Sequence, residues 1–206
     1  MNGVLVKSIK SVVGVLLAAT SVFLLSSCST VDSAASVGKE SISVTTVENS
    51  VKAILDERAA VDTNGMELST GAKLSQDVVR FHLVALLLQE VGVKYRAIPT
   101  EAQIATRRAA IVEQVGGEKS LPQALVGAGI AAQDFNGYVK TMLISERLGQ
   151  VAQAAGVDNT NGAAIQALVV GMASKKGVVV NPRYGAWDAE NANVIDKEPN
   201  TAVTNK

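Results

Sequence analysis

Residues 177–188 constrain the fold more strongly than any other stretch of the chain. They read Gly-Val-Val-Val-Asn-Pro-Arg-Tyr-Gly-Ala-Trp-Asp. Three successive valines favour an extended backbone, because branching at Cβ restricts χ1. Pro182 has no amide donor and keeps Asn181 out of the helical region, so we expect a short strand that ends in a turn at these residues. Such a strand is stable only when it pairs with another strand.

The other predicted strand lies far away in the sequence, at residues 37–44, where a Gly-Lys-Glu turn separates Val37 from Ile42. Most of the sequence between the two strands has helical periodicity. We therefore expect a mainly α fold of about six helices, with a short two-stranded β ribbon formed by the first and last elements. The closing motif is expected to be structural, with Trp187 packed against the helical body near the opening strand. That motif consists of Asn181, Pro182, Tyr184 and Trp187.

The six helices are predicted from apolar residues spaced three and four apart and from capping signals. They cover residues 45–60, 72–91, 100–116, 120–129, 132–154 and 163–176. Capping boxes are predicted at residues 45–48 and at Thr100 with Gln103. The second helix is apolar nearly all round, so we expect it to be the buried central helix and to end at Gly92.

Residues 1–27 have the pattern of a secretory signal peptide. Lys7 and Lys10 precede an apolar run that is too short to span a bilayer comfortably, and Leu-Ser-Ser-Cys follows, ending at Cys28. This ending resembles the lipobox of bacterial lipoproteins, in which the matching cysteine receives a diacylglyceryl thioether. The alternatives for Cys28 are a small buried residue or a free thiol. Lipidation predicts an extracytoplasmic protein that is anchored to the membrane through Cys28.

The rest of the chain is expected to contain one domain, at residues 37–188. Small, mostly polar residues at 28–36 predict a flexible spacer, and the polar, aperiodic residues 189–206 predict a disordered tail. The chain has 19 basic and 19 acidic side chains, and Lys7 and Lys10 are the only charged residues before Cys28, so the remainder has a net charge near −2. This balance and the few aromatic residues argue against a nucleic-acid partner.

No pattern in the sequence predicts catalysis, a metal site or a cofactor. Residues 127–132 match G-x-G-x-x-A, but they follow a helix cap instead of a strand and predict a turn between helices. Residues 36–39 match S-x-x-K without the further motifs of penicillin-binding enzymes. His82 is the only histidine and lies in the most apolar helix, where a packed core or groove residue is expected.

Taken together, these features resemble the chaperone domain of the SurA/PrsA-type extracytoplasmic foldases. The features are a lipoprotein signal, a strand of the form V-G-x-x-x-I-S before a helix, several amphipathic helices, and a last helix ending in V-x-V-N-P-R-Y-G-x-W. The residues that carry the resemblance are Val37, Gly38, Ile42, Ser43, Gly129, Ile130 and 178–187. Many of these foldases insert a parvulin prolyl-isomerase domain beside the last helix. Here only the loop 157–162 stands in that place, so the resemblance does not imply isomerase activity.

The resemblance implies a non-catalytic holdase that binds unfolded or extended segments of exported proteins in an apolar groove. The candidate groove residues are Phe81, Leu88, Phe135, Met142 and Met172. The alternative is a dedicated accessory lipoprotein that binds one specific partner in the cell envelope. An enzyme is the third hypothesis, and loss of an activity in a folded His82→Ala variant would support it.

Overall fold

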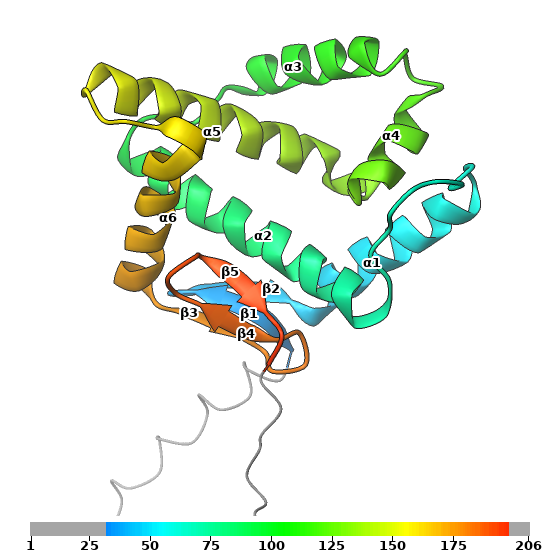
Figure 1. Cartoon of the computed structure of the whole chain (residues 1–206), viewed down its shortest axis with the longest axis horizontal. Coiled ribbons are helices and arrows are strands. Elements are labelled where there is room, and N and C mark those ends of the chain that lie inside the picture. The colour runs from blue at the N-terminus through cyan, green and yellow to red at the C-terminus, as the bar shows by residue number, and fades with distance from the viewer. Residues whose placement is uncertain (1–31, 198–206) are drawn as a thin grey trace, which may run out of the picture. The chain divides into compact units, whose positions relative to one another are not determined.

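A computed structural model describes residues 32–197 and contains six α-helices and five short strands in that range (Figure 1). The mainly α fold predicted from the sequence is confirmed. The helices are α1 (Val44–Ala59), α2 (Gly71–Lys94), α3 (Glu101–Gln114), α4 (Leu121–Ala128), α5 (Phe135–Ala154) and α6 (Ala163–Lys176), with 3-10 turns η1 (Ala132–Asp134) and η2 (Thr160–Gly162). The strands are β1 (Ser33–Val37), β2 (Glu40–Ser43), β3 (Val178–Val180), β4 (Ala186–Asp188) and β5 (Asn193–Ile195).

The predicted two-stranded ribbon is matched only in part, because the sheet has three strands and β3 pairs with β1, which shares only Val37 with the strand predicted at 37–44. The strand order is β2-β1-β3, and β1 is antiparallel to both neighbours. Val37 lies opposite Val178, and Ala35 opposite Val180. The spacer predicted at 28–36 is wrong from Ser33 onward, because β1 begins there and Ala34 is fully buried. Pairing on both sides holds this small-residue segment in place, although its own β propensity is low.

The disordered tail predicted at 189–206 is wrong for residues 189–197. There β5 pairs with β4, so that Trp187 lies opposite Val194. Val194 is buried, and the backbone amides of Glu190 and Asn191 donate to Asp188 Oδ1, which fixes the turn between the strands. Residues 198–206 lie outside the described part of the chain.

The helix ends follow their capping signals, with two exceptions. The capping box of Thr100 and Gln103 is present, and α6 has the predicted bounds. However, Ser43 caps α1 by accepting a hydrogen bond from the Thr46 amide, so the capping box predicted at 45–48 is wrong. Gly92 does not end α2, which continues to Lys94. A Cβ at Gly92 would lie 2.7 Å from Ile98 Cδ1, so this glycine allows close packing within the helix.

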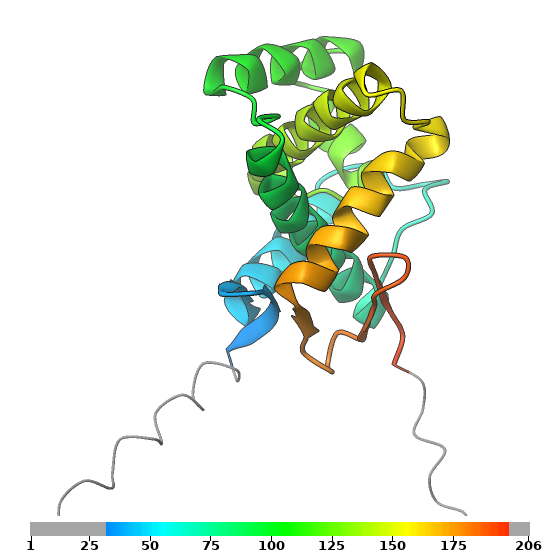
Figure 2. The same cartoon turned by 90° about the vertical axis from the view of Figure 1, so that its left-hand side faces the viewer.

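The central helix α2 carries the main hydrophobic core. Val79, Leu83 and Leu87 are fully buried in it, and α2 packs against α1, α5, α6 and β1. Helix α6 leads from the end of α5 back to the sheet (Figure 2). A second, smaller core lies between α3, α4 and α5 and includes Phe135 and Val139. Within residues 32–197, none of the helices is both long and apolar enough to cross a membrane.

Candidate functional site

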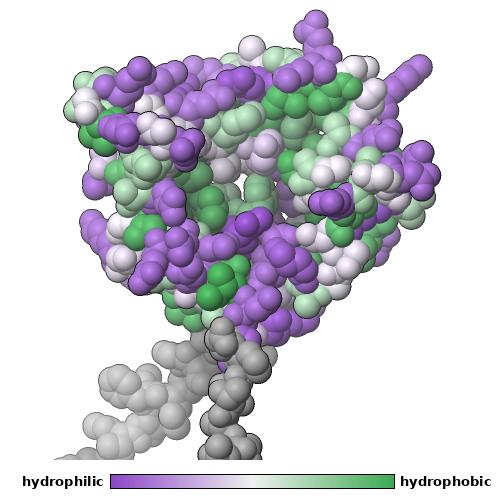
Figure 3. All heavy atoms as spheres, in the orientation of Figure 1, coloured by the Kyte–Doolittle hydropathy of each residue, from purple (hydrophilic) through white to green (hydrophobic). Residues whose placement is uncertain are grey.

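Helices α1 and α5 both pack on α2, but the three helices do not close completely against one another. Figure 3 shows that the visible face is hollowed between α5 and α2, with hydrophobic side chains gathered around the hollow. Two cavities lie along the three helices. Apolar side chains contribute to the lining of both, and charged or polar side chains complete it. We therefore take this seam as the candidate site.

The first cavity, which we call the Phe81 cavity, has a volume of about 250 Å³. It lies where the last turns of α1, the first half of α2, the end of α4 and the start of α5 meet. Half-buried Phe81 and partly exposed Tyr138 are its two aromatic side chains. Its main lining residues are Ile54, Arg58, Leu74, Asp77, Val78, Arg80, Phe81, Gly127, Ile130, Asp134 and Tyr138.

The second cavity, which we call the Lys140 cavity, has a volume of about 310 Å³. It lies between the start of α1, the second half of α2, the middle of α5 and strand β2. Its lining residues are Ser41, Ile42, Thr46, His82, Ala85, Leu86, Gln89, Gly137, Lys140, Thr141 and Ile144. Lys140 is its only lining residue with a permanent charge, and its carbon stem can cover apolar surface while the amine stays in water.

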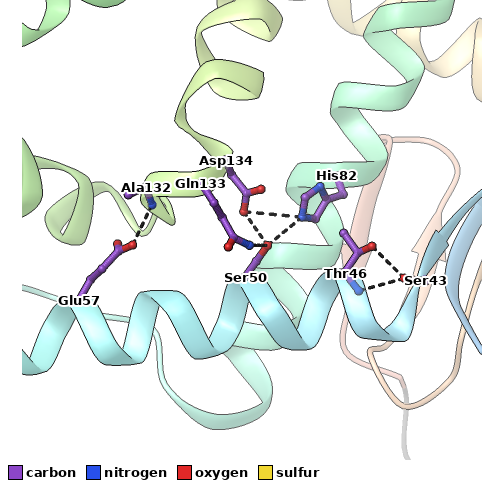
Figure 4. A network of polar contacts seen from close by, with 8 residues as sticks. All are labelled: Ser43, Thr46, Ser50, Glu57, His82, Ala132, Gln133 and Asp134. Carbon is purple, nitrogen blue, oxygen red and sulfur yellow. Dashed lines mark hydrogen bonds and ion pairs between the residues drawn. The ribbon is translucent and has the colours of Figure 1, made fainter.

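A buried polar cluster lies where the two cavities adjoin (Figure 4). Ser50 of α1 donates from Oγ to Asp134 Oδ2 over 2.6 Å. The same Oγ lies 3.3 Å from His82 Nε2 of α2 and 3.4 Å from the side-chain amide of Gln133. Ser50 is 1% exposed, so its hydroxyl needs these partners inside the protein. The cluster joins α1, α2 and the start of α5 at one point.

The number of protons in the cluster determines the tautomer of His82. A serine hydroxyl has one proton, and Ser50 gives it to Asp134. His82 must therefore donate to Ser50 from Nε2, and the neutral ring has no proton on Nδ1. Burial lowers the pKa of His82, and the nearby negative charge of Asp134 opposes this effect only in part. The ring is thus neutral at neutral pH.

Ser50, His82 and Asp134 have the residue types of a catalytic triad but not its geometry. In a triad, the carboxylate binds Nδ1 of the histidine while Nε2 faces the serine. Here Asp134 Oδ2 lies 3.9 Å from His82 Nε2, on the same side of the ring as Ser50. The hydroxyl is also buried and bonded to the carboxylate. This arrangement ties helices together, and it does not present a nucleophile to solvent.

Charged side chains at the Phe81 cavity are held by neighbours within the protein. Arg58 Nη1 donates to the Ser69 carbonyl over 2.7 Å. Burial alone would raise the pKa of Asp77, but hydrogen bonds from Lys73 and Ser69 and the charges of Lys73 and Arg80 outweigh it, so the pKa is lowered. Asp77 therefore remains ionised at neutral pH. On the other side of the cavity, Glu57 Oε1 accepts from the Ala132 amide over 3.0 Å and holds η1 against α1 (Figure 4).

Of the five candidate groove residues, only Phe81 lines one of the two cavities. Leu88 and Met172 are buried in the main core, and Phe135 is buried in the second core, so the prediction that they line an open groove is wrong. Met142 is half-buried and lies outside both cavities. Cys28 lies outside the described residues, so its lipidation stays a prediction.

The closing motif has the structural contacts expected of it. The side-chain amide of Asn181 donates to the Ser33 carbonyl, and its backbone amide donates to the Ala34 carbonyl, which joins the turn to β1. Tyr184 is buried, and Trp187 packs against the main core, whereas Pro182 is exposed in the turn.

The motifs at 127–132 and 36–39 lie at the end of α4 with its connection to η1 and at the end of β1 with the following turn. Gly129 ends α4 in the left-handed conformation, with φ of 67°, and leads through a short connection into η1. Ser36 lies in β1 and Lys39 in the following turn, so the two do not share a helix start. Between residues 32 and 197, no three His, Cys, Asp or Glu side chains gather as a metal site would require.

Comparison with protein-family models, curated proteins and solved structures finds no match to the chain. The resemblance to the SurA/PrsA-type foldases therefore remains a sequence-based prediction. Any proposal about function depends on the geometry of the site and on the sequence features already described.

Proposed function

We propose that the protein is a membrane-anchored, extracytoplasmic lipoprotein that binds unfolded or extended segments of exported proteins without catalysing a reaction. One observation carries this proposal: two adjoining cavities with partly apolar linings remain open along the seam of α1, α2 and α5. The Phe81 cavity has a volume of about 250 Å³ and the Lys140 cavity one of about 310 Å³, both close to the lower limit of about 300 Å³ for typical small-molecule pockets. Cavities of this size suit single side chains of a polypeptide better than a whole cofactor.

The chemistry of the linings supports reversible binding of varied sequences. Phe81 and Tyr138 offer aromatic surface and Leu86 offers aliphatic surface, while Ile42 and Ile144 lie almost wholly buried beneath it. Apolar contacts are non-directional, so they accept many side chains. Polar groups around them can bond to the backbone of a bound segment. The seam thus combines the two kinds of contact that an extended client needs.

The holdase activity is tested with a soluble form that begins at residue 29 and with several unrelated, chemically unfolded clients. We expect suppression of client aggregation at near-stoichiometric ratio. Tyr138→Asp, which places a charge in the Phe81 cavity, should weaken suppression, whereas Val157→Asp, at an exposed site outside both cavities, should not. Failure of the parent protein to protect any client would overturn the holdase proposal. Capture of a single partner by crosslinking in native membranes would then support a dedicated accessory protein.

The membrane anchor is tested separately by replacing Cys28 with serine. We expect the variant to remain unprocessed or to be released from the membrane fraction, because acyl chains supply the stable anchor. Cleavage at the same site together with membrane retention equal to that of the parent would contradict lipidation. Neither outcome depends on client binding.

A further inference from the structure

The two cavities follow one another along α1 and α2. The face of α1 that lines them carries Thr46 in the Lys140 cavity, Ser50 in the polar cluster, and Ile54 and Arg58 in the Phe81 cavity. These residues are spaced four apart, so they form a single stripe on the helix.

Helix α2 carries a matching stripe, whose order along the groove is Val78, His82, Ala85 and Gln89. On the third wall the two linings overlap along the chain, because Asp134 and Tyr138 line the Phe81 cavity whereas Gly137, Thr141 and Ile144 line the Lys140 cavity. Ser50 and His82 lie between the two sections on α1 and α2, and with Asp134 they form a polar partition (Figure 4).

The distance between the sections follows from helix geometry. The Phe81 cavity takes its α2 residues from 74–81, and the Lys140 cavity takes them from 82–89. Equivalent points are thus about eight residues apart, or about 12 Å at 1.5 Å per residue. An extended chain covers about 13 Å in four residues at about 3.3 Å each. Because side chains alternate along a strand, residues four apart point to the same side.

Charge distinguishes the two ends of the groove. Lys140 forms no ion pair with any residue in the described part of the chain, and the nearest titratable group in its cavity, His82, is neutral. In the Phe81 cavity, by contrast, Asp77 is paired with Lys73 and Arg80. The Lys140 end therefore favours an acidic group in the occupant.

We propose that the groove binds an extended polypeptide segment with apolar side chains at positions i and i+4 and an acidic residue beside the one that enters the Lys140 cavity. One apolar side chain fills each cavity, and residue i+2 lies over the polar partition. This inference rests on the proposed function, since it specifies which client segments the holdase prefers.

Substitutions at three glycines provide matched variants that test the proposed binding of an extended segment. Gly127 lines the Phe81 cavity and Gly137 lines the Lys140 cavity. A Cβ at Gly137 meets nothing within 4 Å, and one at Gly127 meets only Met66 Sδ at 3.9 Å. Leucine at either position therefore adds an apolar side chain at the wall of one cavity without a backbone clash. Gly171 of α6 is equally open and lies outside both cavities, so Gly171→Leu is the control.

The probes are fluorescein-labelled peptides on a Gly/Ser background with two leucines, measured by fluorescence polarisation. We expect leucines four positions apart to bind about tenfold more tightly than leucines three apart, because burying a second leucine is worth at least that factor. Gly127→Leu and Gly137→Leu should each abolish this preference, and Gly171→Leu should retain it. Equal binding of the two spacings by the parent, or a preference that survives in both filled variants, would overturn the inference.

The acidic residue is tested by exchanging Asp for Lys beside the second leucine. The parent should bind the Asp peptide about two- to fivefold more tightly, and Lys140→Gln should remove the difference. A preference unchanged in Lys140→Gln would refute the role of this lysine. Client protection without any spacing preference would leave the holdase proposal standing and reject the groove. A spacing preference without client protection would support the groove and reject the holdase proposal.

Discussion

The two sides of α2 differ in how completely they are packed. Leu83 and Leu87 face the main core and have no exposed surface, whereas Phe81, His82 and Gln89 face the seam and are only half-buried. The same helix is thus a structural element on one side and the floor of the proposed groove on the other.

The largest expected effect comes from truncating the packed side. Leu83→Ala should lower the free energy of unfolding by about 2–5 kcal/mol, because a fully buried leucine leaves a cavity that close-packed neighbours fill poorly. Leu86→Ala, in the half-buried lining of the Lys140 cavity, should cost clearly less. Urea denaturation of both variants measures the difference. Equal losses would show that the two sides of α2 are packed alike.

Alanine substitutions at two glycines are expected to change the stability of the protein in opposite directions. Gly92→Ala should destabilise by about 1–3 kcal/mol, because the new Cβ would meet Ile98 Cδ1 at 2.7 Å and Ile144 Cγ2 at 3.1 Å. Gly137→Ala should stabilise by about 0.5–1 kcal/mol, since alanine is the better helix former and the site is open. Thermal unfolding measures both. A destabilised Gly137→Ala variant would mean that the seam has no room for a methyl group.

The polar partition is expected to contribute less to the free energy of unfolding than the packed core does. Ser50→Ala removes the 2.6 Å hydrogen bond to Asp134 and leaves His82 Nε2 without its acceptor, so we expect a loss of about 1–2 kcal/mol. Ser174→Ala, on the exposed face of α6, is the control and should change little. If the two variants were equally stable, the cluster would not hold the helices together.

The smallest effect is the pH dependence that His82 adds. Burial lowers its pKa from the ordinary value of 6.5, although the charge of Asp134 partly offsets this. The unfolded chain therefore takes up a proton near pH 6.5 while the folded protein does so only at lower pH. Stability is complete above this range and falls as the pH drops through it.

His82→Gln should flatten the dependence between pH 6.5 and 5 in denaturation experiments. Asp134 of η1 lies beside His82, and Lys140 of α5 lines the same cavity as His82. Asp77 has a pKa below 3.8 and acts only at lower pH, so it does not contribute to the slope. An unchanged slope in the variant would assign the effect to other groups.

The parts of the fold that were predicted correctly depend on local chemistry. Two lysines and Gly177 mark the end of α6, and Thr100 with Gln103 marks the start of α3. The errors occur where long-range contacts override local preference. Ser33 and Ala34 have little tendency to form a strand, yet pairing with β2 and hydrogen bonds from Asn181 hold them in one. Strand β5 is stabilised by its contact with β4 and α2.

The candidate site was harder to predict for a related reason. Three of the candidate groove residues, Leu88, Phe135 and Met172, are the kind of large apolar side chains that a core buries first. The cluster at the seam joins Ser50 to His82 across 32 positions and to Asp134 across 84, and no local pattern reports such contacts. The one feature of the sequence that could have indicated this site is the four-residue spacing of Thr46, Ser50, Ile54 and Arg58, which places them on one face of α1.

The pairing of β1 with β3 also has a consequence for the order in which the protein can fold. Asn181 bonds to Ser33 across 148 positions, and closing a loop of that length costs chain entropy of roughly 4 kcal/mol beyond a constant. During synthesis, the helices can form as they emerge, but the central strand has no second neighbour until residues 178–180 have been made. The nascent sheet therefore stays open at one edge of β1 until most of the domain has been made.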